Sequence, residues 1–233
     1  MKFFLFIIYL LSGVSIYASL VNDGFKEQQN GNYKKASELY IKACNNESAI
    51  GCYRLANLYF YGLHFKQSNK KARKFYAKSC DGGIAEGCHN LAVFYEYGIS
   101  LKLDNKKASQ LYEKACNYGY PLSCYYLGNM YYSAKGVKKD LDRAVLIWDE
   151  ACDEKQFSSC NNLGVMYNLG LRVPKNLAKA KFLFIKACNG GDKQGCDNLK
   201  NISSNYKNKT KKEKKFLKSC FEGSIDECKT IGY

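Results

Sequence analysis

The chain contains twelve cysteines, the residues whose type and spacing most clearly allow specific chemistry. They fall into six pairs of constant spacing. The two members of each pair lie eight positions apart, and the first five pairs recur every 36 residues. Cysteines at regular spacing can form disulfide bonds, bind a metal ion or act as nucleophilic thiols. The pairs are Cys44/Cys52, Cys80/Cys88, Cys116/Cys124, Cys152/Cys160, Cys188/Cys196 and Cys220/Cys228.

A metal site does not fit this spacing. Structural zinc sites use cysteines separated by about two to four residues, commonly grouped in two clusters. The chain has two histidines, His64 and His89, so a His-rich set of ligands is not available either. We therefore predict no metal and no cofactor, and we assign the cysteines to disulfide bonds.

The N-terminus has the pattern of a secretory signal peptide. Lys2 precedes an apolar run over residues 3–11 that is too short to span a bilayer comfortably, and small residues follow at Ala18 and Ser19. We predict cleavage near Ala18, which makes residues 1–18 a signal peptide; an uncleaved membrane anchor is the alternative. Disulfides persist in the oxidising compartments outside the cytosol, so we expect a periplasmic or extracellular protein without a membrane span after cleavage.

The cysteine period belongs to a longer repeat that consists of two amphipathic segments. In the first segment Cys, Leu and Tyr lie three and four residues apart, as in Cys52, Leu55 and Tyr59, which puts them on one helical face. In the second segment a small residue precedes an aromatic residue by four positions. These small–aromatic pairs are Ala72/Tyr76, Ala108/Tyr112, Ala144/Trp148 and Ala180/Phe184. Each unit is therefore predicted to be a helix pair that stacks on its neighbours to bury its apolar face.

This pattern resembles tetratricopeptide repeats, and it is closer to Sel1-like repeats, which lengthen the loop inside the helix pair. Residues 127–131 (Leu-Gly-Asn-Met-Tyr), residues 136–140 (Gly-Val-Lys-Lys-Asp), Ala144 and Trp148 carry most of that family's signature. The resemblance implies an all-α fold, a right-handed α/α superhelix (solenoid) of about six helix pairs stapled by disulfides. The expected units cover residues 19–48, 49–84, 85–120, 121–156, 157–192 and 193–224, with a C-terminal cap over 225–233.

Each cysteine pair is expected to link the end of one second helix to the start of the next first helix. Turn residues such as Asp81, Gly82 and Gly83 lie between the two members of a pair. Antiparallel helices joined by a short turn bring the flanking residues within disulfide range. Pairing within each local pair is therefore favoured, although sequence alone does not determine the connectivity.

The last unit departs from the repeat pattern. Lys212 stands where the other units have Ala, and residues 205–215 are rich in Lys and Asn. A polar and degenerate terminal repeat is typical of a cap. A capped solenoid has no need to oligomerise, so we expect a monomer.

A resemblance to tetratricopeptide proteins implies that the first helices line a concave groove that binds a protein or peptide. The helix face opposite the Cys–Leu–Tyr stripe is rich in Tyr, which gives contact area at low entropic cost, and in Asn, which can pair with a peptide backbone. Candidate binding residues on this face are Tyr53, Asn57, His89, Tyr125, Asn129 and Asn161. We select the equivalent residues Asn57 and Asn129 as ligand contacts; the alternative is that these side chains pack between adjacent helices.

The chain is strongly basic, with a formal net charge of +15 at pH 7 that comes almost entirely from lysine. Such a field attracts nucleic acid, anionic lipid or acidic partners. Nucleic acid does not suit an exported protein that is poor in arginine, the usual base-reading residue. We expect a solvated lysine face that keeps the solenoid soluble, with binding to acidic host or cell-wall polymers as the alternative.

The signal peptide, the 36-residue units, the cysteine pair in each unit and the basic charge also resemble the Helicobacter cysteine-rich proteins. The attribution of that family as penicillin-binding proteins with β-lactamase activity implies a β-lactam amidohydrolase as the alternative function. Serine β-lactamases use a Ser followed by a Lys three residues on, together with Ser-Asp-Asn and Lys-Thr-Gly elements. Ser68/Lys71 and Ser204/Lys207 match the first element, but a chain this rich in lysine contains such matches by chance. The other two elements are absent. The catalytic residues are therefore unknown, and a β-lactam or cell-wall ligand rests on the resemblance alone.

Overall fold

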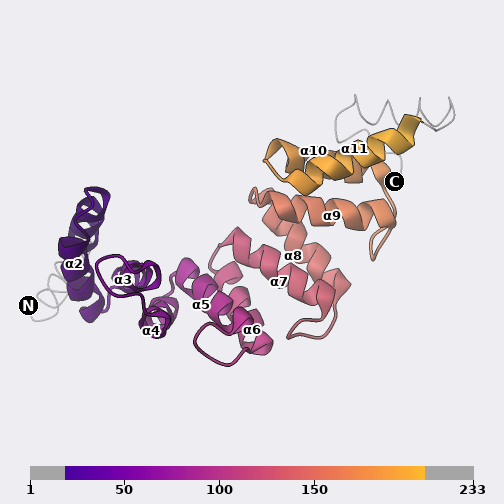
Figure 1. The fold of residues 1–233 in the computed structure, drawn as a ribbon. Coiled ribbons are helices and arrows are strands. Elements are labelled where there is room, and N and C mark those ends of the chain that lie inside the picture. Colours follow the sequence, from indigo (N-terminus) through magenta and orange to yellow (C-terminus); the bar gives the residue numbers. More distant parts are fainter. Residues whose placement is uncertain (1–18, 208–233) are drawn as a thin grey trace, which may run out of the picture. The chain divides into compact units, whose positions relative to one another are not determined.

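The computed structural model describes residues 19–207, and all their regular secondary structure is helical. Residues 19–29 form a helix, and the labelled helices follow in chain order (Figure 1). They are α2 (Tyr33–Asn45), α3 (Ala49–Tyr61), α4 (Asn69–Asp81), α5 (Ala85–Tyr97), α6 (Asn105–Asn117), α7 (Pro121–Ser133), α8 (Leu141–Asp153), α9 (Phe157–Leu169), α10 (Leu177–Asn189) and α11 (Lys193–Lys207). The expected signal peptide and the cap expected over 225–233 lie outside the described residues.

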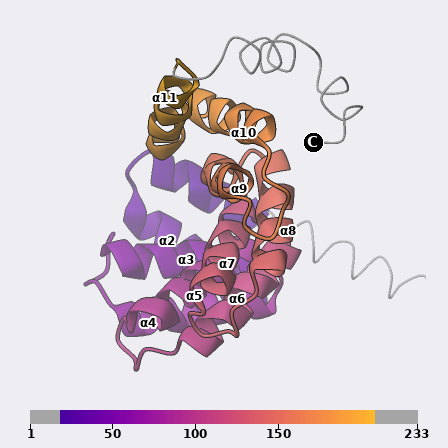
Figure 2. The ribbon, with the colours of Figure 1, turned by 90° about the vertical axis from the view of Figure 1, so that its right-hand side faces the viewer.

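The chain divides into two compact units, an N-terminal unit (Met1–Tyr120) and a C-terminal unit (Pro121–Tyr233). In the N-terminal unit α3 packs against α2 and α4, and α5 packs against α4 and α6. In the C-terminal unit α8 packs against α7 and α9, and α10 packs against α9 and α11, an order that both ribbon views show (Figures 1 and 2). Each unit is therefore an all-α stack in which sequence neighbours share the core, as the repeat pattern predicted.

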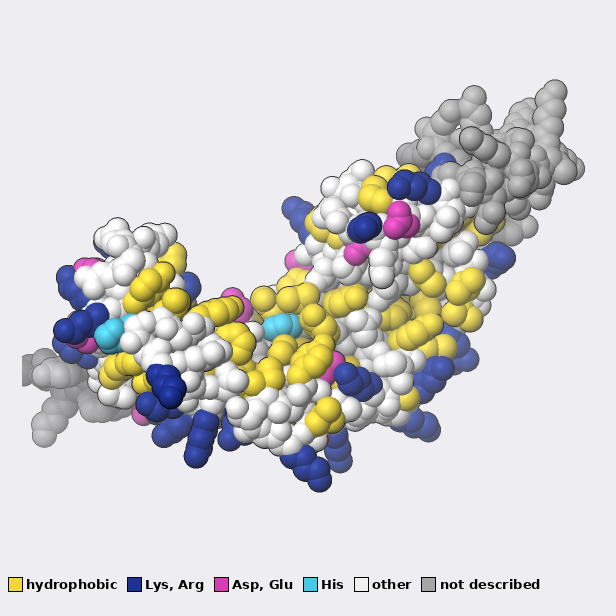
Figure 3. All heavy atoms as spheres, viewed as in Figure 1, with side chains coloured by type: hydrophobic (Ala, Val, Ile, Leu, Met, Phe, Trp, Pro, Cys, Tyr) yellow, Lys and Arg dark blue, Asp and Glu magenta, His cyan; other side chains and the backbone are white. Residues whose placement is uncertain are grey.

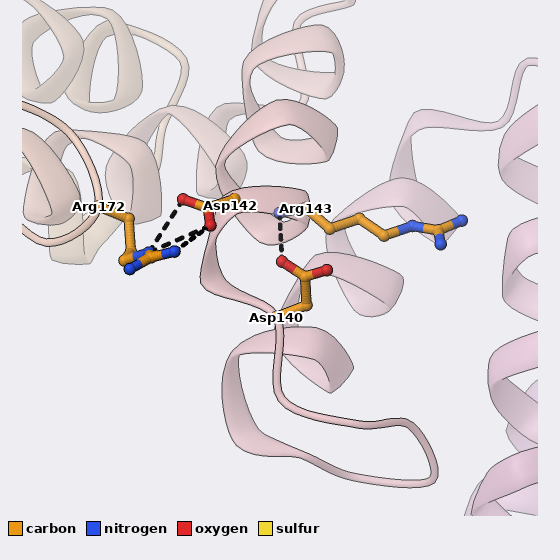
Figure 4. Close-up of polar contacts among 4 residues, drawn as sticks. All are labelled: Asp140, Asp142, Arg143 and Arg172. Carbon is orange, nitrogen blue, oxygen red and sulfur yellow. Dashed lines mark hydrogen bonds and ion pairs between the residues drawn. The ribbon is translucent and has the colours of Figure 1, made fainter.

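The second helix of each repeat begins at a polar residue in the same register. Ser68, Asp104, Asp140 and Asn176 each accept a hydrogen bond from the backbone N–H three residues further on. Figure 4 shows one of these caps, in which Asp140 Oδ1 accepts from the Arg143 N–H at 2.9 Å. Such a cap satisfies a backbone donor that the first turn of a helix leaves unpaired. It therefore sets the starting residue of α4, α6, α8 and α10.

The loop after α9 is tied to the preceding repeat by a side-chain contact. The Arg172 guanidinium donates to both carboxylate oxygens of Asp142 in α8 (Figure 4). This hydrogen bond lowers the pKa of the Asp142 carboxyl below its usual value. Both side chains are more than half exposed, so the pair orders the loop more than it stabilises the fold.

Four of the described cysteine pairs are disulfide-bonded within the pair. The Cα–Cα distances are 4.6 Å for Cys44–Cys52, 4.5 Å for Cys80–Cys88, 4.7 Å for Cys152–Cys160 and 4.5 Å for Cys188–Cys196. Cys116 and Cys124 are disulfide-bonded as well. Each bond with these distances joins the last turn of a second helix to the first turn of the next helix, which is the expected staple between repeats.

The sixth cysteine pair is not part of the described structure. Both Cys220 and Cys228 lie beyond residue 207, where the described residues end. The bond expected between Cys220 and Cys228 therefore stays a prediction from the sequence, based on the spacing that this pair shares with the five described pairs.

The turn inside each of the five cysteine pairs before residue 207 contains one residue with left-handed backbone geometry. Gly83, Gly119 and Gly191 occupy this position with φ of 88°, 78° and 88°, and glycine adopts such values without strain. Glu47 and Lys155 adopt φ of 63° and 62° at the same position. A non-glycine residue in this region costs roughly 1–2 kcal/mol. The packing of the flanking helices therefore imposes the turn even where the sequence does not favour it.

The core of each repeat is built on the small–aromatic pairs of the second helices. Their alanines are fully buried and their aromatic side chains are at most 2% exposed. In the C-terminal unit the aromatic ring lies directly on a glycine of the first helix, Trp148 on Gly128 and Phe184 on Gly164. The Trp148 indole N–H also donates to the Tyr125 carbonyl oxygen at 3.3 Å. Small first-helix residues thus allow the two helices of a pair to approach closely.

Gly128→Ala is expected to lower the free energy of unfolding by about 1–3 kcal/mol because it overpacks this contact. A methyl group at position 128 would lie 2.6 Å from Cδ1 of the enclosed Trp148 ring, which outweighs the helix preference of alanine. The repeats that contain Tyr76 and Tyr112 have alanine at the equivalent position, so Gly128→Ala with Trp148→Tyr should recover most of the loss. Urea denaturation measures the free energy of unfolding of the wild type, the single variant and the double variant. If Gly128→Ala were as stable as the wild type, the close contact between Trp148 and Gly128 would be contradicted.

Candidate functional site

The six candidate binding residues lie on first helices of both units. In the N-terminal unit α3 carries Tyr53 and Asn57, and α5 carries His89. In the C-terminal unit α7 carries Tyr125 and Asn129, and α9 carries Asn161. Burial separates them into two groups. Tyr53, Asn57, Tyr125 and Asn129 are half-buried, whereas His89 and Asn161 are 7% and 3% exposed.

An internal hydrogen bond sets the orientation of the Asn57 carboxamide. Its Oδ1 accepts from the Tyr76 hydroxyl at 2.7 Å. The Tyr76 oxygen in turn accepts a hydrogen bond from Asn90, so the phenolic proton is committed to Asn57. Burial raises the pKa of Tyr76 well above its usual range, which keeps this hydroxyl a donor at every physiological pH. The Nδ2 group of Asn57 has no acceptor among the described residues.

The equivalent Asn129 is oriented in the same sense by a different partner. Its Oδ1 accepts from Asn162 Nδ2 at 2.9 Å, a bond that connects α7 to α9 across a repeat boundary. Asn129 Nδ2 has no acceptor within residues 19–207. In both repeats the oxygen of the carboxamide is therefore engaged inside the protein, and the amino group remains to donate to water or to a ligand.

Asn161 occupies a different chemical environment from the other two asparagines. Its Oδ1 accepts from Asn198 Nδ2 at 2.8 Å, and its own Nδ2 donates to Asn162 Oδ1 at 3.4 Å. Together with the Asn162–Asn129 bond, these contacts form a chain of carboxamides through α7, α9 and α11. Because Asn161 is 3% exposed and engaged at both ends, we assign it to cohesion between repeats.

His89 is enclosed by aromatic rings of the N-terminal unit. Its ring centroid lies 5.4 Å from that of Tyr112 and 5.1 Å from that of Tyr120. Burial lowers the pKa of His89 to about 4, and the carboxylate of Glu96 opposes this shift. Glu96 Oε2 also accepts from the Tyr112 hydroxyl at 2.6 Å. His89 is therefore a neutral core side chain at pH 7, and the ligand proposal does not depend on it.

Tyr53 and Tyr125 stand one helical turn before Asn57 and Asn129, respectively. The Tyr53 ring lies 6.1 Å from the Tyr76 ring, and the Tyr125 ring meets Tyr126 edge-on at 5.3 Å. Each is half-buried and keeps part of its side chain in solvent. Each half-exposed asparagine therefore has a partly exposed tyrosine beside it on the same helix.

Sequence reasoning missed the residues that orient these carboxamides. Asn90, Asn162 and Asn198 recur at multiples of the 36-residue repeat, one position after the predicted binding position. That recurrence was the available signal. It was not recognised because these side chains form hydrogen bonds to a neighbouring repeat. Their role can be inferred only when the partner residue on that repeat is known.

The residues that match a β-lactamase element have another explanation. Ser68 Oγ accepts from the Lys71 backbone N–H at 3.3 Å, so Ser68 is the N-cap of α4. The side chains of Ser204 and Lys207 lie outside the described residues. Within residues 19–207 no group of three His, Cys, Asp or Glu side chains could hold a metal ion. No helix of that region is long and apolar enough to cross a membrane.

The repeats identify the class of protein. The Sel1 repeat model matches residues 21–48, 49–84, 85–120, 121–155 and 158–192. The chain therefore belongs to the Sel1 repeat family. A search of the curated proteins found no match to this chain.

Solved structures include several that are similar to this chain. A Sel1 repeat protein from Oxalobacter formigenes has a TM-score of 0.73 at 22% identity, with 80% of this chain and 78% of that chain covered. The protective antigen c5321 of uropathogenic Escherichia coli has a TM-score of 0.74 at 27% identity. The match covers 88% of the chain described here and 44% of the antigen. Cysteine-rich protein B of Helicobacter pylori is 35% identical, with a TM-score of 0.46. The match covers 56% of the chain described here and 93% of the Helicobacter protein. The first two likenesses place the fold among the Sel1 repeat structures.

Proposed function

We propose that this Sel1 repeat protein is a secreted, disulfide-stapled scaffold that binds an extended segment of a partner protein along its first helices. The observation that carries the proposal is the common orientation of the Asn57 and Asn129 carboxamides. Each Oδ1 is held by an internal donor, at 2.7 Å and 2.9 Å respectively, and each Nδ2 is left to donate. A side chain held in this way loses little further entropy when it binds.

The ligand chemistry follows from the group that remains available. An amide Nδ2 donates hydrogen bonds and does not accept them, so it matches carbonyl oxygens. An extended peptide presents backbone carbonyls along its whole length, independent of side-chain sequence. Tyr53 and Tyr125 add contact area beside these donors. Because Asn57 belongs to the N-terminal unit and Asn129 to the C-terminal unit, each unit carries one contact of this kind.

Export is the second part of the proposal. It is supported by the signal-like residues 1–18 and by the disulfides, which are rare in reducing compartments. A partner would then be met in the periplasm or outside the cell. The stapled repeats would give the ligand a surface that keeps its geometry there.

The test replaces each carboxamide with the carboxylate of the same shape. Asn57→Asp and Asn129→Asp keep the acceptor oxygen for Tyr76 and Asn162 but remove the donors. The probe is a set of synthetic peptides recovered by panning a displayed random-peptide library on the mature, oxidised chain. The double variant should bind them about tenfold more weakly or worse, since each missing hydrogen bond contributes about 0.5–1.5 kcal/mol.

A matched control changes the same charge at positions away from the proposed contacts. Asn117 and Asn189 are exposed, and the equivalent residues in other repeats are Asp81 and Asp153. Asn117→Asp with Asn189→Asp should therefore leave both fold and peptide affinity unchanged. Equal affinity of the test and control variants, or failure to recover any peptide, would count against the proposed function.

A further inference from the structure

The outward positions of the second helices in the N-terminal unit carry lysine in a regular arrangement. Two positions eight residues apart are lysine in each of α2, α4 and α6. These residues are exposed, apart from the half-buried Lys114. They are Lys34 and Lys42 in α2, Lys70 and Lys78 in α4, and Lys106 and Lys114 in α6. We call this set the lysine face.

The charge of this face is largely uncompensated. The helices α2, α4 and α6 together contain eleven Lys and Arg residues and three acidic residues. Asp81 lies 3.8 Å from Lys114, and no ion pair involving a described residue engages Lys70, Lys74 or Lys78. These three lysines follow one another at intervals of about 6 Å along α4. Like charges at this spacing repel, so the arrangement costs stability unless an anion is present.

The fold does not require lysine at these positions. The equivalent residues of the C-terminal unit are Asp142 and Glu150 in α8, and Ala178 and Lys186 in α10. The helices α8 and α10 together contain four basic and four acidic residues. Both units keep the buried small–aromatic pairs, so the outward positions vary independently of the core. The lysine face is thus a property of one unit and not of the repeat.

Figure 3 shows the Lys and Arg side chains of this unit projecting along the lower edge, beneath α4 and α6. We propose that the lysine face binds an anionic polysaccharide, a sugar chain that carries carboxylate or sulfate groups. Lysine offers a flexible point charge that does not demand bidentate geometry, which suits charges that are spread along a polymer. Attraction at several points adds up although each contact is weak.

Two other polyanions fit this face less well. Single-stranded nucleic acid is bound by aromatic side chains interleaved with cations. An interfacial helix needs an apolar face that enters the bilayer. The outward residues midway between the lysines are Glu38, Lys74 and Gln110. These residues provide neither aromatic rings for stacking bases nor an apolar face that could enter a bilayer. This inference concerns a different surface from the asparagine contacts and shares with the proposed function only the export that would expose the protein to such polymers.

The experiment compares two triple variants of the full mature chain. Lys70→Gln, Lys74→Gln and Lys78→Gln remove charge from the α4 part of this surface. Lys138→Gln, Lys139→Gln and Lys175→Gln remove the same charge from exposed positions of the C-terminal unit. The probes are heparin, which carries sulfate and carboxylate, and polygalacturonate, which carries carboxylate alone. Single-stranded DNA and phosphatidylglycerol vesicles serve as the competing polyanions.

The α4 variant should bind the polysaccharides at least tenfold more weakly than the wild type at physiological salt. The slope of log affinity against log salt concentration should fall by about two to three, roughly one for each lysine replaced. The affinity of the control variant should stay within about twofold of the wild-type value. Neither variant should unfold at a lower temperature than the wild type, and the α4 variant gains a little stability from the loss of like-charge repulsion. Equal losses of affinity in the two variants would show that net charge alone is responsible and would overturn the proposal. Tighter binding of DNA or vesicles than of either polysaccharide would overturn it as well.

Discussion

Reduction of the disulfides with dithiothreitol is expected to unfold the protein under conditions in which the oxidised chain is folded. Each bond closes a loop of about nine residues, and the chain-entropy relation assigns roughly 2–3 kcal/mol to a loop of that length. The bonds at the described cysteines together contribute on the order of 10 kcal/mol, which is comparable with the whole stability of an ordinary domain. Far-UV circular dichroism during guanidinium titration, with and without reductant, measures the difference.

A single staple provides the graded version of this prediction. Cys80→Ala with Cys88→Ala should lower the free energy of unfolding by about 2–3 kcal/mol without abolishing the fold. Both side chains are at most 1% exposed, so their removal also leaves a small cavity that adds to the effect. Identical denaturation midpoints for the oxidised and reduced wild-type protein would show that helix packing alone holds the repeats together.

The sequence predicted the helix pairs because their residues follow a short, local rule. Ala72 and Tyr76 lie four residues apart, as do their equivalents in each later repeat, and this spacing alone places them on one helical face. Cys80 and Cys88 flank a turn, so their proximity also follows from local geometry. The left-handed turn residues Glu47 and Lys155 could not be predicted in this way, because the backbone there is imposed by the flanking helices.

The candidate site was predictable only in part for the same physical reason. Asn57 and Asn129 were selected from their register, and both lie half-buried on first helices. The residues that orient them, Tyr76 and Asn162, belong to other helices. The spacing of residues along the sequence does not say which side chains of two helices form a hydrogen bond. Asn161 shares the register of Tyr53 and Tyr125 but is almost fully buried. Burial at one repeat position thus depends on the side chains that the next helix brings.

Stability is expected to fall between pH 6.5 and pH 4 because of His89. Its pKa is lowered by burial to about 4 in the folded chain and returns to its ordinary value of 6.5 on unfolding. Between these values the unfolded chain binds a proton that the folded chain does not, so the free energy of unfolding decreases as the pH decreases. The difference amounts to about 3 kcal/mol at pH 4 and below, and it vanishes above about pH 6.5.

His89→Asn isolates this contribution from that of the carboxylates, which also weaken the fold in acid. Asparagine is the residue found at the equivalent position 161, so the substitution is compatible with a first helix. The variant should lose less stability than the wild type between pH 6.5 and pH 4. The same substitution at the exposed His64, where asparagine tolerates the φ of 69°, provides the matched control for the change of residue. Parallel profiles for wild type and His89→Asn would mean that the buried imidazole accepts its proton without unfolding, and that Glu96 or solvent reaches it in the folded chain.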